Sequence, residues 1–152
     1  MMSLKKILLP LALAGFAIAL KTTPNVSNNF TVKTRDDQPP FLTGTQSGQG
    51  TFFDTGLGAC GFINDNSEHI AAVSNFLFDA YLGYDGIDSY SNPVCGRQVT
   101  AYCVYRYSYS TTVTITDSCD GCALTDIDFT PTAFADLADL DIGRINISWE
   151  WV

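Results

Sequence analysis

The segment INISWEWV, residues 145–152, has the most regular pattern in the chain and decides its fold class. Apolar side chains at Ile145, Ile147, Trp149 and Trp151 alternate with the side chains between them. Alternate residues of a β-strand point to opposite faces, so this segment predicts a strand with one face in the core and the other largely in water. The fold is therefore expected to be built on strands.

Three upstream segments also have the features of strands. Residues 50–54 form a short aromatic run, and residues 111–117 alternate, with Val113 and Ile115 on one side. Residues 98–107 alternate as well, and their apolar face would carry Val99, Ala101, Cys103, Tyr105 and Tyr107.

Two segments predict helices. Residues 68–81 have apolar side chains at helical spacing, namely Ile70, Val73, Leu77 and Phe78. Thr130-Pro131 predicts a second helix start, because the hydroxyl caps backbone N–H groups and proline needs no N–H there. That helix would turn Phe134 and Leu137 inward and end near residue 139. Short strands, two small helices and no βαβ alternation predict a small barrel, all-β with short helices.

Length and charge exclude several classes of protein. A chain of 152 residues corresponds to one domain of ordinary size. Lys and Arg total 8 against 16 Asp and Glu, a net charge of −8, so the chain lacks the basic face of a nucleic-acid binder. With 46% hydrophobic and 16% charged residues, it is not a disordered acidic chain either.

Residues 1–20 have the pattern of a secretory signal peptide. Lys5 and Lys6 precede an uncharged apolar run over residues 7–20, and Ala17 and Ala19 give a small-x-small cleavage site. A membrane anchor is the alternative, but the run is too short to span a bilayer comfortably. We expect a soluble, secreted, extracellular protein in an oxidising space where disulfides persist.

Removal of the signal would leave six basic and sixteen acidic residues, a net charge of −10. An anionic surface suits neutral or cationic partners, such as neutral polysaccharide, chitosan or a basic protein. The alternative is that the charge serves only solubility.

Residues 21–47 are polar, rich in Thr, Asn, Pro and Gly, and without helical or strand period. They predict a disordered arm, followed by a globular domain at residues 48–152. Acceptor sequons place candidate glycosylation sites at Asn25 and Asn29 in the arm and at Asn146 in the last strand.

The five cysteines include a C-x-x-C pair, Cys119 and Cys122. A zinc site would need two more ligands, and His69 is the sole histidine; a redox motif would need a thioredoxin-like context. A structural bridge therefore suits a secreted chain better. Cys103, on the apolar face of its strand, is a candidate free, buried thiol. The sequence contains no flavin-binding or metal-binding constellation, and we expect neither a cofactor nor a metal.

Four motifs in this order carry a family resemblance: GTFFDTGLGACG at 50–61, NPVCGR at 92–97, VTITDSCDGCALTDIDFTPTAF at 113–134 and LADLDIGRINISWEW at 137–151. Together they resemble the secreted fungal double-psi β-barrel proteins, the rare-lipoprotein-A-like, barwin-related and expansin-like group. The short single-domain members are described as loosenins or, in older naming, riboflavin-aldehyde-forming enzymes. The resemblance covers residues 48–152 and lacks the C-terminal carbohydrate-binding domain of true expansins.

The resemblance implies a six-stranded double-psi β-barrel with a shallow groove that binds polysaccharide. It also implies a disulfide between Cys60 and Cys95. Two candidate catalytic residues carry over: Asp117, in the VTD-type segment, and Asp128, in the LDLSP-type segment. Carboxyl groups beside apolar neighbours tend to have a raised pKa, as general acids need. Alternatively, each aspartate caps backbone N–H groups of a turn or helix.

Asp54 is a third candidate catalytic residue. Phe52-Phe53-Asp54 is similar to the strand end that supplies the base in family 45 endoglucanases, in which Asp128 would match the acid. An inverting glycosidase needs its two carboxyl groups roughly 6.5–9.5 Å apart, with a water molecule between them.

Three function classes follow. The first is non-hydrolytic binding and loosening of cell-wall polysaccharide, with Phe53, Tyr81 and Tyr84 as stacking surfaces for cellulose, chitin or chitosan. The second is a weak glycoside hydrolase or lytic enzyme that uses Asp54 and Asp128. The third is a protein-binding module, either a cysteine-protease inhibitor or a plant-facing effector. In each case we expect a monomer.

Overall fold

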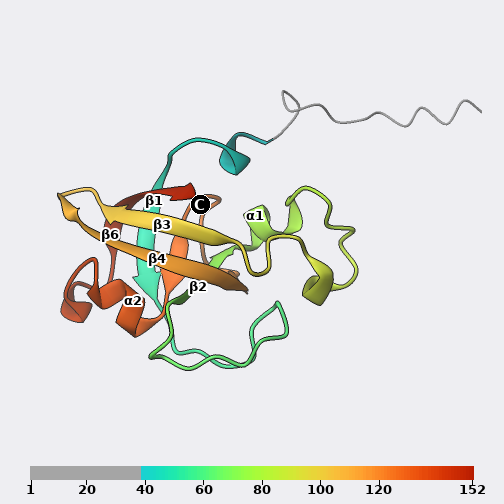
Figure 1. The fold of residues 1–152 in the computed structure, drawn as a ribbon, viewed down its shortest axis with the longest axis horizontal. Coiled ribbons are helices and arrows are strands. Elements are labelled where there is room, and N and C mark those ends of the chain that lie inside the picture. Colours follow the sequence, from blue (N-terminus) through green and yellow to red (C-terminus); the bar gives the residue numbers. More distant parts are fainter. Residues whose placement is uncertain (1–38) are drawn as a thin grey trace, which may run out of the picture. The chain divides into compact units, whose positions relative to one another are not determined.

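A computed structural model of the protein describes residues 39–152, coloured by position in Figure 1. The predicted signal peptide, the sequons at Asn25 and Asn29 and the arm up to residue 38 lie outside the described residues. None of the helices described between residues 39 and 152 is long and apolar enough to cross a membrane.

Six strands close into a barrel in the order β1-β5-β2-β4-β3-β6, so the predicted six-stranded architecture is confirmed. The first strand pairs in parallel with β5 and antiparallel with the last, β6. The strands are β1 (Gln46–Phe52), β2 (Ile70–Ser74), β3 (Gln98–Cys103), β4 (Arg106–Cys119), β5 (Ile127–Phe129) and β6 (Ile145–Trp151).

Two short α-helices, α1 (Asn75–Asp79) and α2 (Pro131–Ala135), lie at separate places around the barrel (Figure 1). Helix α2 starts as predicted, with the Thr130 side chain accepting a hydrogen bond from the Ala133 N–H, and it buries Phe134. It ends at Ala135, before the predicted residue 139. Within residues 39–152 there are also three single-turn 3-10 helices: Pro40–Leu42, Ser89–Ser91 and Leu140–Ile142.

The predicted helix over residues 68–81 is wrong in its first half, where residues 70–74 form β2. This strand lies between β4 and β5, and all five of its residues are buried. A strand buried on both faces has no polar-apolar alternation. Its apolar residues therefore combined with Leu77 and Phe78 of α1 to imitate a helical period.

The alternation over residues 98–107 contains a hairpin rather than one strand. Val99, Ala101 and Cys103 are buried on β3, but the strand ends at Cys103. Tyr105 lies in the turn and Tyr107 on β4, and both are exposed. A two-residue turn preserves the period of two, so the sequence pattern continued through it.

The fold begins before the boundary predicted at residue 48, because β1 starts at Gln46. Phe41 is buried ahead of it, and its carbonyl accepts a hydrogen bond from Trp151 Nε1 at 2.8 Å. On the core side β1 carries Gly50, where a Cβ would lie 3.0 Å from the Phe129 ring. The first half of β1 has no apolar period, so the sequence extends the polar arm to residue 47 and predicts a strand only from residue 50.

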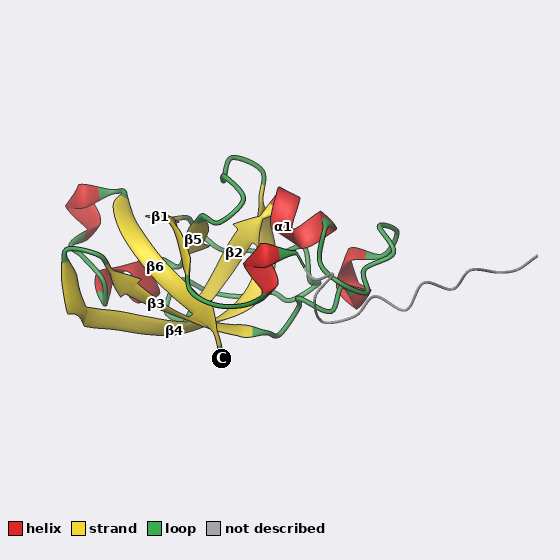
Figure 2. Ribbon diagram, turned by 90° about the horizontal axis from the view of Figure 1, so that it is seen from above, coloured by secondary structure: helices red, strands yellow, loops and turns green. Residues whose placement is uncertain are grey.

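The core fills the barrel, and Trp149, Phe129 and Phe134 are its largest fully buried side chains. Figure 2 shows the strands from above, with β6, β3 and β4 on one side of the barrel and α1 near the end of β2. The predicted alternation of β6 is confirmed: Ile145, Ile147 and Trp149 are buried, whereas the residues between them are exposed or half-buried.

Candidate functional site

Asp128 projects from the outer face of β5, where its neighbours Ile127 and Phe129 are fully buried in the core. Thr51 is its register partner on β1, and Thr51 Oγ1 donates a hydrogen bond of 2.5 Å to Asp128 Oδ1. Adjacent strands therefore place a hydroxyl and a half-buried carboxyl side by side on the outside of the barrel.

Burial raises the pKa of Asp128 above its ordinary value, because the charged carboxylate loses contact with water. The Thr51 hydrogen bond and the positive charge of Arg144 act in the opposite direction, and the negative charge of Asp117 adds to the rise. A raised pKa keeps the proton on this group to higher pH, so Asp128 can donate a hydrogen bond or a proton.

Asp117 reaches the same part of the surface from β4. Its register partner is Ala72 of β2, which is also the partner of Asp128, so the two aspartates flank one residue. Asp117 Oδ1 accepts hydrogen bonds from the backbone N–H groups of Ala59, at 2.7 Å, and Ser118, at 2.8 Å. This carboxylate thus caps backbone groups, the structural alternative raised by the sequence, whereas Asp128 is bonded to a side-chain hydroxyl.

Asp54 follows the end of β1 and is exposed. Its Oδ1 accepts a hydrogen bond from Asn66 Nδ2 at 2.8 Å, and Asn66 Oδ1 also receives the Thr55 N–H. The carboxylate is therefore part of the hydrogen bonding that closes its own loop. Within residues 39–152, no hydrogen bond joins Asp54 to Asp128 or Asp117.

Both disulfides expected from the sequence are present, Cys60–Cys95 and Cys119–Cys122, and Cys103 is a buried free thiol. The two Sγ atoms of the Cys119–Cys122 bridge and a carboxylate oxygen of Asp128 lie within 4.8 Å of one another. The bridge therefore lies against the Asp128 carboxyl, and it displaces water there.

The aromatic residues predicted to stack on sugars are more buried than expected. Tyr81 is a core residue, 7% exposed; its hydroxyl accepts a hydrogen bond from Arg97 and its ring packs edge-on against Trp151. The prediction that Tyr81 offers a binding face is wrong, because Arg97 satisfies the hydroxyl inside the fold. Tyr84 is half-buried with its edge toward Phe78, and Phe53 is also half-buried.

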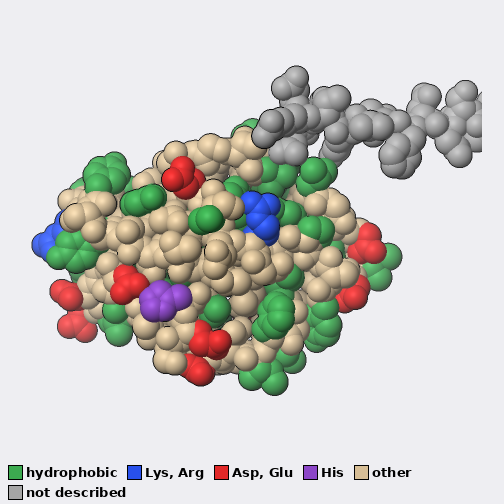
Figure 3. Space-filling view, viewed as in Figure 1, with side chains coloured by type: hydrophobic (Ala, Val, Ile, Leu, Met, Phe, Trp, Pro, Cys, Tyr) green, Lys and Arg blue, Asp and Glu red, His purple; other side chains and the backbone are tan. Residues whose placement is uncertain are grey.

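The sequence reasoning missed an exposed apolar loop beside Asp117. Leu57 and Ile63 pair across this loop, and Leu57, Phe62 and Ile63 are 66%, 49% and 83% exposed. Figure 3 shows hydrophobic side chains gathered along the edge of the molecule where this loop lies in Figure 1. The sequence feature that could have indicated this loop is the run LGACGFI, in which large apolar residues lie on either side of small ones. Thr51 was also missed, since an isolated threonine on a strand has no distinctive pattern.

Comparison with known proteins gives the fold and the family. No family model matches the sequence. The chain is 36% identical over 106 residues to the allergen Asp f 7 homolog of Arthroderma benhamiae and 32% identical over 109 residues to allergen Asp f 7 of Aspergillus fumigatus. Each match covers 67% of this chain but only 32% and 35% of the relative, so the chain spans about a third of their length.

Two solved structures share the barrel. The Streptomyces papain inhibitor is 30% identical, with a TM-score of 0.62, over 73% of this chain and 96% of the inhibitor. A mutant of the Clavibacter michiganensis expansin, in complex with cellohexaose, is 23% identical with a TM-score of 0.55, over 72% of this chain and 50% of the expansin. The motif order, the closed six-stranded barrel and the match to nearly the whole papain inhibitor agree: this chain belongs to the double-psi β-barrel proteins of the rare-lipoprotein-A-like, barwin-related and expansin-like group.

Proposed function

We propose that the protein binds cell-wall polysaccharide without hydrolysing it, through the outer face formed by Thr51, Asp117 and Asp128. The observation that carries the proposal is the Asp128 carboxyl, half-buried, with a raised pKa, and paired with the Thr51 hydroxyl on the surface. The expansin that shares this fold was solved with cellohexaose bound, which supports a glycan as the ligand.

The chemistry of this face suits the hydroxyl groups of sugars. The ionised Asp128 carboxylate accepts charge-assisted hydrogen bonds from sugar hydroxyls, its protonated form donates to a sugar oxygen, and the Thr51 hydroxyl can also accept. Such groups compete for the hydrogen bonds that join neighbouring glycan chains. Binding of this kind loosens a polysaccharide without breaking a glycosidic bond.

Hydrolysis by inversion would need a second carboxylate free to activate water. Asp117 accepts two backbone N–H groups, and Asp54 is bonded to Asn66 in its loop. Both are therefore engaged in structural hydrogen bonds, which favours the non-hydrolytic function.

The test measures binding and cleavage together. The protein is incubated with cellulose, chitin or chitosan, and sedimentation and release of reducing ends are followed in the same samples. We expect binding with no more than trace sugar release, and about tenfold weaker binding for Asp128→Asn, which loses a charge-assisted hydrogen bond.

Asp54→Ala serves as the matched variant, and we expect it to bind like the wild type. Unchanged binding by a folded Asp128→Asn protein would contradict the proposed role of this residue. Repeated release of reducing ends that both substitutions abolish would instead identify a family-45-like inverting hydrolase.

A second candidate function is inhibition of a cysteine protease. It is favoured by the 30% identity to the Streptomyces papain inhibitor over 96% of that chain and by the exposed loop containing Leu57, Phe62 and Ile63. Cys60 in this loop is bridged to Cys95, which restrains the loop. A restrained loop loses less conformational entropy when it binds a partner.

Papain activity measured with increasing amounts of the protein tests this candidate. We expect a Leu57→Ser, Ile63→Ser double variant to inhibit at least about tenfold more weakly, whereas Asp128→Asn inhibits like the wild type. Equal inhibition by the wild type and the double variant would exclude the loop, and absence of inhibition would exclude the function.

We also propose that the protein is exported as a monomer after cleavage near residue 20, with glycans on the sequons. The two disulfides support an oxidising destination. Mass spectrometry and size-exclusion chromatography of the protein recovered from culture medium test the cleavage site, the glycans and the monomeric state.

A further inference from the structure

A cavity of about 580 Å³ lies between the β3–β4 hairpin, β6 and the segment that follows α2. Its lining contains neither Thr51, Asp117 nor Asp128, so it is a different site from the proposed glycan-binding face, although the charge of Arg144 reaches both. Cavities of roughly 300–1,000 Å³ are the usual size for small organic ligands.

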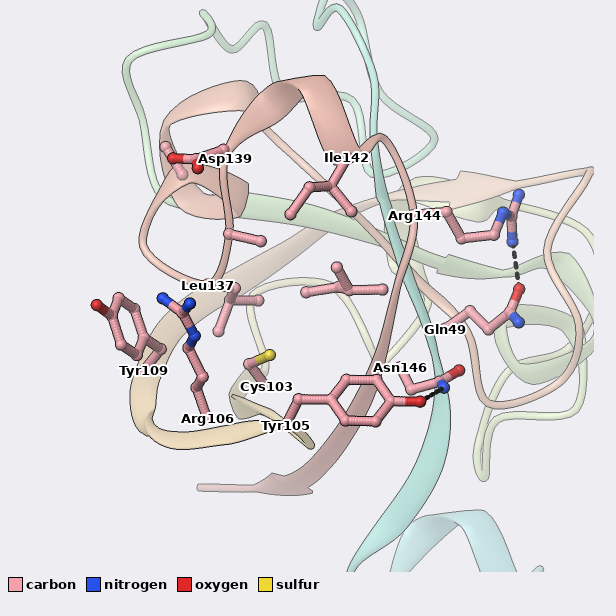
Figure 4. Close-up of a pocket in the computed structure, with 13 residues that line it drawn as sticks. Gln49, Cys103, Tyr105, Arg106, Tyr109, Leu137, Asp139, Ile142, Arg144 and Asn146 are labelled. Atoms are coloured by element: carbon pink, nitrogen blue, oxygen red, sulfur yellow. Dashed lines mark hydrogen bonds between the residues drawn. The ribbon is translucent and has the colours of Figure 1, made fainter.

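The inner side of the cavity is apolar. Cys103, Leu137 and Ile145 are buried there, and Figure 4 shows Cys103 and Leu137 near the middle of the view. Such a surface offers no hydrogen bonds to the many hydroxyl groups of a sugar. It suits a ligand with a hydrocarbon body.

The mouth of the cavity is aromatic and cationic. Tyr105 is 77% exposed and Tyr109 is 43% exposed, so both rings present surface to a ligand. The Arg106 guanidinium lies over the Tyr109 ring, 5.6 Å from its centroid, and in Figure 4 it points past Leu137. Stacking fixes the plane of a guanidinium while its edge remains able to bind a carboxylate with two hydrogen bonds.

The side chains that line the cavity are more basic than the chain as a whole. From residue 48 onward the sequence has three basic residues, Arg97, Arg106 and Arg144, and two of them line this cavity although the net charge is −8. Arg144 donates to Gln49 Oε1, whereas Arg106 makes no side-chain hydrogen bond within residues 39–152. In that part of the chain the sole ion pair is His69–Asp136, so the Arg106 guanidinium has no carboxylate partner.

Asp139 also lines the cavity. In Figure 4 its carboxylate lies at the outer edge, apart from the Arg106 guanidinium. A ligand anion beside Arg106 would therefore not meet it directly.

We propose that this cavity binds a small aromatic carboxylate, a flat ring bearing one acidic group. The ring packs over Leu137 and against the tyrosines of the mouth, and the carboxylate pairs with Arg106. The size of the cavity, its apolar inner side, its aromatic mouth and its unpaired guanidinium all fit this class of molecule. A neutral sugar has neither a hydrocarbon body for the apolar inner side nor a carboxylate for Arg106.

The experiment compares two probes of one shape. Calorimetric titration uses 4-hydroxycinnamate and its primary amide, which lacks the charge, on the full chain produced without glycosylation, because Asn146 lies at the rim. We expect the acid to bind at least about tenfold more tightly than the amide, as for a charge-assisted pair. Arg106→Gln should remove that preference, and Arg97→Gln, which changes an arginine that does not line the cavity, should keep it.

Cys103 reports where the probe binds, because it is the free cysteine of the chain and lines the cavity. Saturating 4-hydroxycinnamate should slow alkylation of Cys103 by iodoacetamide, and mass spectrometry measures the modified fraction. Equal affinity for acid and amide, equal loss in both arginine variants, or unchanged alkylation under saturation would each overturn the proposal.

Discussion

The carboxyl group of Asp128 is half-buried, so protein atoms replace part of its hydration shell. Burial is the main reason why its pKa is raised, and the Thr51 hydrogen bond opposes that rise. A raised folded-state pKa means that folding favours the protonated group. Its stabilising contribution is fully present below the ordinary value of 3.8 and is lost as the pH rises through the higher folded value.

Asp128→Asn has no charge at any pH and therefore removes this dependence. We expect the unfolding free energy of the variant, relative to the wild type, to increase from below pH 3.8 to neutrality, as measured by urea unfolding at several pH values. Thr51→Val removes the hydrogen bond that favours the ionised form, so the unfolding free energy of this variant should fall further with rising pH than that of the wild type, over a window that extends to higher pH. A difference that stays constant with pH would show that the pKa of Asp128 is not raised.

Gly58 supports Asp117 through a close approach of two backbones. A Cβ at Gly58 would lie 2.5 Å from the Thr116 carbonyl oxygen and 3.3 Å from Asp117 Cβ, whereas a Cβ at Gly56 would meet no atom within 4 Å. Gly58→Ala should therefore lower the unfolding free energy by about 1–3 kcal/mol, and Gly56→Ala should leave it nearly unchanged. Urea denaturation of the two variants measures the difference, and equal stabilities would mean that the loop moves freely away from Asp117.

Individual site residues could be predicted only in part. Asp117 and Asp128 were predicted from family motifs, and their hydrogen bonds in the structure then distinguished their roles. Tyr81 was wrongly expected at the surface because its burial depends on Arg97, which lies 16 residues further along the chain. Cys103 was predicted as a buried thiol, but its position in a cavity depends on Leu137, which no local pattern connects to it.

At the scale of elements, the sequence predicted those strands that have one wet face. The last strand, β6, has that arrangement and its alternation was unmistakable. The strand β1 was predicted only in its second half, as residues 50–54. Two strands were missed for different reasons: β2 is buried throughout, and β5 has only three residues. Register and neighbours depend on pairing across the barrel, so they could not be derived from either segment alone.

The two disulfides differ chiefly in the length of chain that they close. Cys60–Cys95 spans 35 residues and Cys119–Cys122 spans 3. In the chain-entropy model, replacing the first pair by serine costs about 4 kcal/mol of unfolding free energy and replacing the second costs about 2 kcal/mol. Urea midpoints of the two double-serine variants test this order, and a larger loss for the short bridge would refute an entropic origin.

At the scale of the whole molecule, the barrel is closed by β6, which pairs with β3 on one side and β1 on the other. A variant that ends at Gly143 lacks this strand, and we expect it to show no cooperative unfolding transition and poorly dispersed NMR spectra. Removal of Val152 alone, which is 71% exposed, should preserve both properties. A cooperative transition in the shorter variant would mean that five strands form a stable sheet.

The position of β6 near residue 150 also determines when the growing polypeptide can close its barrel. Residues 145–151 are synthesised about a hundred residues after β1, yet β1 and β3 have unpaired edges until they arrive. The nascent chain therefore cannot close its barrel until residues 145–151 have been synthesised.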